Sequence, residues 1–408
     1  MTDPLEAMSR AELARLGREY LLAGHMIDRA GMPYVVKELG LDAMRDVAIE
    51  EWMSASPVYT RRVRRALGFE GDDVATIFKG MQFDIGAPHQ FMDFRFTVHD
   101  AAHGEFSLAS CGALMDVEPM GEPFVVTMCH HIEDPTFDAT ASATNPRARM
   151  RPVHRPPRMP ADRLPHCNWL VEIDPNAEPL NEPEGARWLA TSKAAHTDLR
   201  TPPADDHDDG DTTYDGWDPD ISFERFSRAT LLRLLDEIAL QGHLLARAYM
   251  RAVERRSDAA TAARLGAHQF TGAAGLVAKR LARFLGTGSG VDAIADVLAI
   301  HPAFRPRAYV SSQVSTSDGA LTFALERCDA LDEGDRLTWP AIAANEGGSA
   351  IAAIVHAVDP DARVEQDSGA PVWRITEGTE QAPVAEEVTV ASFSTGADYT
   401  FASAKLDR

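Results

Sequence analysis

The stretch LARLGREYLLAGHMIDRAGMPYV, residues 13–35, recurs without a gap as LLRLLDEIALQGHLLARAYMRAV, residues 231–253. Of the 23 aligned positions 11 are identical, where unrelated sequences would share about one or two. Gly24-His25 falls on Gly242-His243, and Arg29-Ala30 falls on Arg247-Ala248. We infer that the chain is an internal duplication.

The repeat continues into a second, strand-like pattern. FRFTVHDAAHGEFSLASCGAL (94–114) and YVSSQVSTSDGALTFALERCDAL (309–331) each read as strand, glycine-containing turn, strand and cysteine. HCNWLVEI (166–173) likewise corresponds to APVWRITE (370–377) through a shared tryptophan. The duplication therefore extends over most of both halves.

Apolar periodicity predicts helices first and a sheet second within each copy. Strands are expected at 148–155 and 166–174, after a hairpin over 93–110. We predict an α/β fold of the α+β kind, in which two tandem copies each pack an N-terminal helical segment on a small, mostly antiparallel sheet. The expected helices span 10–22, 25–40, 42–54, 56–68 and 72–82, with breaks at Gly31, Gly40, Pro57 and Gly71.

The predicted organisation is a first copy over 1–174, a linker over 175–221 and a second copy over 222–408. The linker is rich in Pro, Asp and Glu, which favours a solvated segment. Its Asp205–Asp211 run is also dense in oxygen ligands, but the spacing is not that of an EF-hand loop. A duplicated unit often reproduces a homodimer within one chain, so we expect a pseudo-dimeric monomer.

Composition excludes several classes of protein. The 408 residues carry a formal charge of −22, which disfavours nucleic acid as a partner. No apolar run reaches the about 18 residues that a membrane span needs, and the N-terminus lacks the pattern of a secretory signal. Four cysteines at irregular spacing do not make a disulfide framework. We expect a cytoplasmic protein that binds neither membranes nor nucleic acid.

The densest group of reactive side chains lies in GEPFVVTMCHHIEDPTFDATASATNP, residues 121–146. If this segment is helical, Cys129 and Glu133 lie one turn apart and suit a thiolate–carboxylate pair or two ligands of one metal. If it is a strand, Cys129 and His131 share a face instead. A third interpretation is a packed cysteine beside solvated charges. Asp134 and Asp138 continue the acidic pattern.

Comparing the copies separates structural from functional cysteines. The second copy has Ala370-Pro371 at the place of His166-Cys167, and no cysteine matches Cys129, whereas Cys111 is matched by Cys328. Residues kept in both copies serve the shared fold, so Cys129 and Cys167 are the functional candidates. Cys111 is expected to be structural, although it could still line the site. By the same reasoning His25, matched by His243, is expected to be a packed helix residue.

A basic run from Arg147 to Arg163 stands out in so acidic a chain. Guanidinium groups bind carboxylates and phosphates through paired hydrogen bonds, so Arg149, Arg151 and Arg155 are candidates for binding an anionic ligand. Pairing with the chain's own acidic residues is the alternative.

EFSLASC, CHHIEDPTFD, NPRARMR and HCNWLVEI together resemble the L-2-amino-thiazoline-4-carboxylic acid hydrolase-like family, which is similar in turn to 4-vinyl reductase and haem-nitric-oxide-binding-like domains. The resemblance covers about residues 80–175 and, more weakly, 305–378. It implies a site built from Cys111, Cys129, Cys167 and an acid after the second cysteine. The acid typical of the family three residues beyond that cysteine is Ile132 here, with Glu133 and Asp134 next in line. The family name implies hydrolysis of a cyclic C–N bond in a small sulfur-containing acid.

Two functions remain open from the sequence. The first is a C–N bond hydrolase for a small anionic substrate, using Cys129, Glu133, Cys167 and His131 as catalytic residues. In its metal-dependent form, Cys129, Cys167, Glu133 and His166 would hold zinc or iron that activates water. The second is a non-catalytic protein that binds a small molecule, a metal or haem. No GxGxxG or Walker motif supports a nucleotide cofactor.

Overall fold

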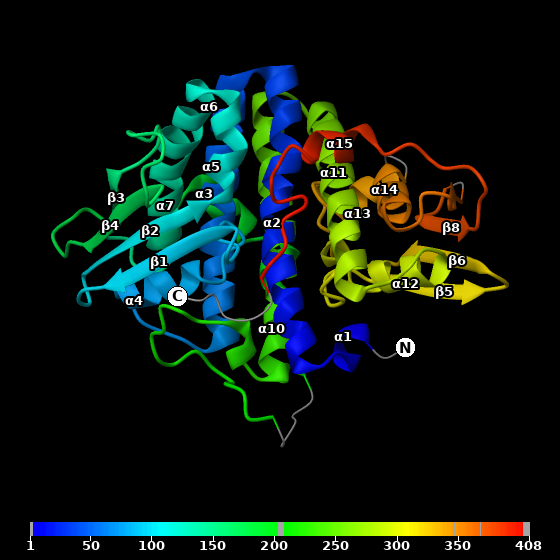
Figure 1. The fold of residues 1–408 in the computed structure, drawn as a ribbon, viewed down its shortest axis with the longest axis horizontal. Helices are drawn as coiled ribbons and strands as arrows, with labels where there is room; N and C mark the ends of the chain where they lie inside the picture. Colours follow the sequence, from blue (N-terminus) through cyan, green and yellow to red (C-terminus); the bar gives the residue numbers. More distant parts are fainter. Residues whose placement is uncertain (1–2, 203–207, 346–347, 368, 403–408) are drawn as a thin grey trace.

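A computed structural model describes residues 3–202, 208–345, 348–367 and 369–402. Long helices stand in the centre of the molecule, and one small sheet lies at each end (Figure 1). The first copy contains α1 (Pro4–Ala7), α2 (Arg10–Leu39), α3 (Leu41–Leu67), α4 (Val74–Met81), β1 (Met92–Val98), β2 (His103–Cys111), α5 (Gly112–Val117), η1 (Glu118–Met120), α6 (Glu122–Val126), η2 (Thr127–Ile132), α7 (Glu133–Ser142), β3 (Ala148–His154) and β4 (Cys167–Ile173).

The second copy repeats this order of helices and strands. It contains η3 (Phe223–Arg225), α10 (Arg228–Arg256), α11 (Ala259–Leu285), α12 (Val291–Ile300), η4 (Pro302–Phe304), β5 (Ser312–Ser317), β6 (Ala320–Leu325), α13 (Trp339–Asn345), α14 (Ser349–Val358), β7 (Arg363–Gln366) and β8 (Val372–Thr376). Between the copies lie α8 (Glu184–Leu189) and α9 (Lys193–His196), and α15 (Glu386–Ala391) follows the second sheet.

Both sheets are antiparallel and have equivalent strand orders, β1-β2-β4-β3 and β5-β6-β8-β7. The pairing register is also shared, because Phe106 lies opposite Trp169 and Phe323 lies opposite Trp373. All four side chains are buried. The predicted α+β fold of two tandem copies, with its hairpin over 93–110, is confirmed.

The copies pack through their long helices. The helix α10 packs along α3 of the first copy, and α2 packs along α11 of the second. Two equivalent ion pairs cross this interface. Arg62 binds both carboxylate oxygens of Glu237 at 2.8 Å, and Arg280 binds Glu19 at 2.7 and 2.8 Å. Adding 218 to Arg62 gives Arg280, and subtracting 218 from Glu237 gives Glu19, so the interface has an approximate twofold relation.

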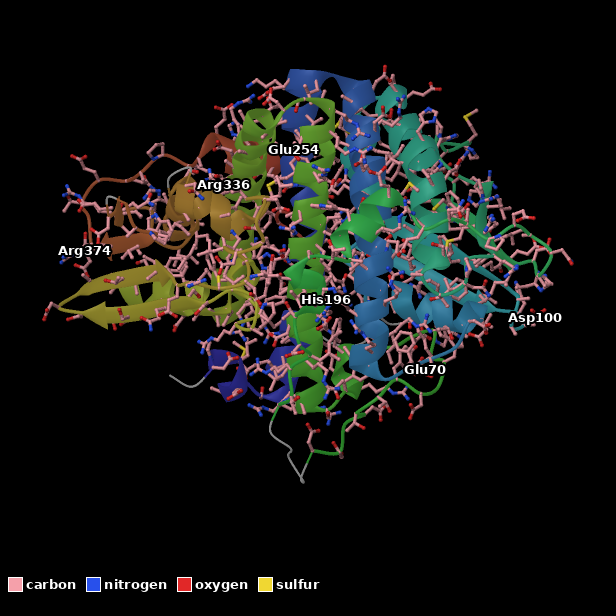
Figure 2. All side chains as sticks on the ribbon, turned by 180° about the vertical axis from the view of Figure 1, so that it is seen from behind. Glu70, Asp100, His196, Glu254, Arg336 and Arg374 are labelled. Atoms are coloured by element: carbon pink, nitrogen blue, oxygen red, sulfur yellow. The ribbon has the colours of Figure 1, made fainter. Side chains whose placement is uncertain are left out.

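Each copy ends in a segment that crosses to the other copy; we call residues 184–197 the first strap and residues 386–399 the second strap. The helix of the first strap, α8, packs on α3 and α10, and that of the second, α15, packs on α11 and α2. The straps lie on opposite faces of the central helices, as α15 in Figure 1 and His196 in Figure 2 show.

A carboxylate of the opposite copy holds each strap. Glu333 accepts hydrogen bonds of 3.0 Å from the backbone N–H groups of Lys193 and Ala194. Asp116 accepts from the Thr395 N–H at 2.7 Å and from the Ser394 hydroxyl at 2.5 Å. Glu333 and Asp116 are separated by 217 residues, within one residue of the offset of the ion pairs, so the straps are duplicated features of the fold.

Two parts of the sequence prediction differ from this structure. The helix α2 continues through Gly31, and α3 continues through Pro57, where breaks were expected. A side chain at position 31 would meet Tyr249 and Gln269 at 2.9 Å, so this glycine allows close helix packing and does not end the helix. Burial of both helices between the copies offsets the weak local helix propensity.

The segment 175–221, expected to be a solvated linker, contains α8 and α9. Ala186, Leu189, Ala194 and Tyr214 of this segment are fully buried. The sequence did not predict this burial because the apolar residues are few among many acidic ones. The helices are also too short to show helical periodicity. Asp205, Asp206 and His207 of the acidic run lie outside the described residues.

Among the described residues, no single helix has both the length and the apolar composition needed to cross a membrane. Only α13 and α14 taken together reach those values, and the two are bent by 101° at their junction.

Candidate functional site

Cys111, Cys129 and Cys167 meet in one buried apolar cluster of the first copy. Cys111 ends β2, Cys167 begins β4, and Cys129 lies in η2. The segment η2 is a π-helical turn between α6 and α7, and such turns are frequent at functional sites. Of the two conformations considered from the sequence, residues 121–146 therefore adopt the helical one and not the strand.

Glu133 follows the π-helical turn, at the start of α7. Its Oε2 is buried without a hydrogen-bond partner, and burial raises the pKa of Glu133 to about 8. Burial, and next the Glu133 carboxylate, raises the pKa of the Cys111 thiol to about 12, and the same causes raise the pKa values of Cys129 and Cys167. The three thiols are therefore uncharged at neutral pH, which disfavours them as nucleophiles.

A cavity of about 110 Å³ lies beside this cluster, enclosed by α2, α3, α7 and the segment between α4 and β1. Most of its wall is apolar. Its polar lining consists of His25, Arg29, Trp52, Tyr59, Asp84, Glu133, Thr136 and Thr140. We call this space the Glu133 cavity.

The polar groups of the Glu133 cavity are unusually short of partners. Both ring nitrogens of His25 are buried with no hydrogen bond, and burial holds the pKa of His25 well below its usual range. The Nε of Arg29 also has no hydrogen bond and lies 3.5 Å from Asp28 Oδ2. A buried polar group without a hydrogen bond is costly, so these groups indicate that a ligand or water completes them.

Asp84 is better satisfied than its neighbours. Its Oδ1 accepts hydrogen bonds of 2.7 Å from the Tyr59 hydroxyl and from the Gly86 N–H. Burial nevertheless raises the pKa of Asp84 to about 6. The cavity thus contains two carboxyl groups whose protonation changes at different pH, beside a neutral imidazole.

Two further buried acids, Asp28 and Glu51, lie near Arg29 behind the cavity lining. Asp28 accepts a hydrogen bond of 3.4 Å from the Trp52 indole N–H. Both carboxylate oxygens of Glu51 are buried without a hydrogen bond, and burial, followed by the charge of Asp28, raises the pKa of Glu51 well above its usual range. Buried acidic groups without hydrogen bonds destabilise a helical core, and such groups are typical of functional sites.

The second copy replaces these groups with neutral or paired ones at the same helix positions. At an offset of 218, Asp28 becomes Ala246, Glu51 becomes Gln269 and Tyr59 becomes Val277. Arg247, the counterpart of Arg29, pairs with Asp335 at 2.9 Å.

The space itself is also nearly closed in the second copy. His243, Val277 and His301, the counterparts of His25, Tyr59 and Asp84, line a space of only about 20 Å³. Trp339 closes it, stacked on Phe270 with ring centroids 4.7 Å apart.

Several residues predicted from the sequence lie away from the Glu133 cavity. His131 is exposed. His130 contacts the Pro156 carbonyl oxygen at 2.6 Å, and His166 Nδ1 accepts a hydrogen bond of 3.1 Å from the Cys111 N–H. His166 therefore fixes the end of β2.

The predicted arginines bind groups of the protein itself. Arg149 donates to the carbonyl oxygens of Ala148 and Glu178, and Arg151 pairs with Asp138 at 3.0 Å. Arg155 pairs with Asp134 and lies over the Trp169 ring. Of this run, Arg155 is near enough to Glu133 to counter the rise in the pKa of Glu133.

The donor set does not fit a metal ion. Within the described ranges, no three His, Cys, Asp or Glu side chains converge where a cation could bind. Arg29 and Arg155 are also close enough to Glu133 to lower its pKa, so two positive charges already lie near this carboxyl group. We therefore derive no chemical step through zinc or iron.

Comparisons with protein-family models, with curated proteins and with solved structures find no match to this chain. The resemblance drawn from the sequence motifs therefore stays a prediction.

His25, Arg29, Tyr59 and Asp84 line the Glu133 cavity but were not predicted from the sequence. His25 and Arg29 are identical in both copies, so comparison by identity marked them as structural. The signal that could have found the site was the loss of ionisable residues along the helices, from Asp28 and Glu51 to Ala246 and Gln269.

Proposed function

We propose that the first copy is a hydrolase that binds a small organic anion in the Glu133 cavity and acts on it by acid–base catalysis. The observation that carries this proposal is the meeting of Glu133, His25 and Arg29, each with a buried atom lacking a hydrogen bond, on the wall of one cavity. In the second copy the equivalent space is nearly closed.

Each of these residues has a distinct role in the proposed reaction. Arg29 binds the anionic group of the substrate, since a guanidinium favours planar anions. His25 is neutral and orients the attacking water, and Asp84, which is ionised at neutral pH, accepts the proton of that water. Glu133 is protonated at neutral pH and donates its proton to the leaving nitrogen. The water oxygen bonds to carbon as the C–N bond breaks, so a ring would open by the net addition of one water.

The experiment uses L-2-amino-thiazoline-4-carboxylic acid as the probe with the full chain. Binding is measured by calorimetry, and turnover by the gain of one water in the mass of the product. Arg29→Met should weaken binding by about 10-fold to 100-fold, as expected for a hydrogen bond to a charged group. Arg29→Lys should recover part of this loss.

Glu133→Gln should remove turnover and retain binding. Glu172→Gln is the matched control because Glu172 is exposed on β4. Absence of binding by the wild-type chain, or equal binding by the wild type and Arg29→Met, would contradict the proposal for this substrate class.

A non-catalytic small-molecule-binding protein is the second candidate. The mostly apolar wall of the Glu133 cavity supports it, because such pockets bind ligands with few oriented polar contacts. Binding that depends on Arg29, without turnover of any acid tested, would favour this candidate.

A further inference from the structure

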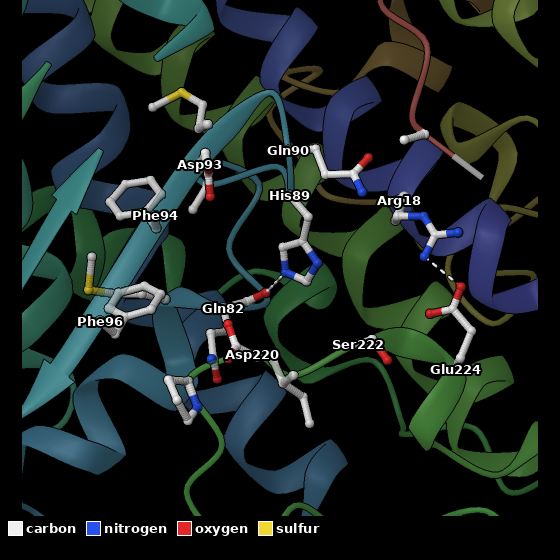
Figure 3. A pocket seen from close by; sticks show the side chains of 16 residues that line it. Arg18, Gln82, His89, Gln90, Asp93, Phe94, Phe96, Asp220, Ser222 and Glu224 are labelled. Carbon is white, nitrogen blue, oxygen red and sulfur yellow. Dashed lines mark hydrogen bonds and ion pairs between the residues drawn. The ribbon is translucent and has the colours of Figure 1, made fainter. Parts of the chain in front are cut away.

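A larger cavity, which we call the outer groove, lies against the Glu133 cavity. Its volume is about 650 Å³, and it is lined by β1, the segment before β1 and residues 219–224 (Figure 3). Met81, Ala87, Met92 and Phe94 line both spaces. One layer of side chains therefore separates the outer groove from the Glu133 cavity.

That dividing wall is adaptable. Two of its four residues are methionines, whose unbranched side chains repack easily and are frequent on binding surfaces. On the side of the outer groove, Phe94 and Phe96 stack with ring centroids 5.7 Å apart. Ile221 also lines the outer groove. The outer groove thus offers an apolar surface on the far side of the dividing wall from the Glu133 cavity.

Polar groups also line the outer groove, and Asp93 among them lies beside Phe94. Figure 3 shows His89 and Gln90 on the turn before β1, with Arg18 and Glu224 beyond them. Arg18 and Glu224 form an ion pair of 2.6 Å. Gln90 has a left-handed backbone with φ of 67°, and its Oε1 is buried without a hydrogen bond. Strain and an unpartnered polar atom in one residue are typical of a binding site.

We propose that the ligand is an amphipathic organic acid whose anionic head lies in the Glu133 cavity and whose apolar tail extends past Met81 and Met92 into the outer groove. This inference rests on the proposed function, because it takes Arg29 as the anchor of the head group. The difference in volume supports it. The Glu133 cavity, at about 110 Å³, has room only for a head group, whereas the outer groove, at about 650 Å³, has room for a tail of many atoms.

The test is a series of straight-chain carboxylates, from butanoate to decanoate, titrated into the full chain below their micelle concentrations. Affinity should rise about fourfold per added methylene, the value expected for burying a CH₂ group. Decyltrimethylammonium has a decyl chain but a cationic head, and it should bind far more weakly than decanoate because Arg29 repels it.

Filling the outer groove should remove the dependence on chain length. Ser222 is exposed on the groove lining, so Ser222→Trp should bring the ratio of decanoate to butanoate affinity close to one. Ser315→Trp is the matched control because Ser315 is exposed on β5 of the second copy, and the ratio should stay as in the wild type.

The outcomes separate this inference from the proposed function. If butanoate binds through Arg29 but affinity is flat along the series, the inference fails and the proposed function stands. Equal binding of decyltrimethylammonium and decanoate, or an unchanged ratio in Ser222→Trp, also overturns the inference. If no carboxylate binds, the proposed function fails with it.

Discussion

Arg29 and Arg247 occupy the same position of the same helix in the two copies, but their surroundings differ. Arg247 is neutralised by Asp335 and donates to the Leu337 carbonyl oxygen. Arg29 lies 3.5 Å from Asp28 Oδ2 and faces a cavity. The scaffold therefore keeps the arginine in both copies, and its partners decide whether it serves packing or ligand binding.

The same difference extends to the neighbouring side chains. Gln269 accepts a hydrogen bond of 3.3 Å from the Trp339 indole N–H, whereas its counterpart Glu51 has no hydrogen bond at either oxygen. The second copy thus replaces a buried acid without a hydrogen bond by a neutral amide whose oxygen is hydrogen-bonded. Four pairs of substitutions test this comparison.

The largest expected effect is at the ion pairs between the copies. Arg62→Ala should lower the free energy of unfolding by about 3–5 kcal/mol, because Glu237 is left buried without its partner. Arg280→Ala should cost less, since Glu19 is 17% exposed against 1% for Glu237. Urea denaturation measures both, and equal losses would show that the pairs have the same environment.

The next effect concerns the side chain that closes the second copy. Trp339→Ala should lower the free energy of unfolding by about 3 kcal/mol through a new cavity and the loss of the Gln269 hydrogen bond. Trp52→Ala in the first copy should cost less, because Trp52 is half-buried beside an existing cavity. Thermal unfolding of the two variants tests this order, and a larger loss for Trp52→Ala would contradict it.

A smaller effect comes from the buried acid of the first copy. The pKa of Glu133 is raised from 4.5 to about 8, so its neutral form is favoured in the folded state. Stability from this group is complete below pH 4.5 and declines as the pH rises towards 8. Glu133→Gln should remove that decline. Glu172→Gln should retain the wild-type profile, and an unchanged slope in Glu133→Gln would show that Glu133 is solvated.

The smallest effect is expected at the straps. Ser192 accepts from the Ala195 N–H and Ser394 accepts from the Gly396 N–H, each at 3.2 Å. Ser192→Ala and Ser394→Ala should each cost about 1 kcal/mol. Ser394→Ala should cost slightly more because the Ser394 hydroxyl donates to the Asp116 carboxylate, whereas the Ser192 hydroxyl donates to the neutral Leu189 carbonyl oxygen. Melting temperatures in one buffer measure the difference, and no loss in either variant would mean that the backbone contacts alone hold the straps.

The sequence predicted the fold well where one pattern repeats. Identities such as Gly24-His25 and Gly242-His243 revealed the duplication, and alternating residues located the hairpin. The straps escaped prediction because Leu189 and Ala194 are isolated apolar residues in an acidic segment. Their burial depends on helices far away in the sequence.

Prediction of the site was less complete for a similar reason. Cys129, Cys167 and Glu133 could be found because reactive residue types cluster around them and no cysteine of the second copy matches Cys129 or Cys167. Arg29 and His25 could not, because the property that distinguishes them from Arg247 and His243 is the larger cavity that they line. That property arises from packing against α3 and the segment before β1, which residue identity does not reveal.

The crossed straps have a consequence for dissecting the protein. Because α10 packs on α3 and α2 packs on α11, a chain cut after the first strap would leave each fragment with exposed apolar helix faces. Neither fragment should be a self-sufficient folding unit. Together, however, the fragments keep every reciprocal contact, so coexpressed halves should assemble by complementation into one non-covalent heterodimer.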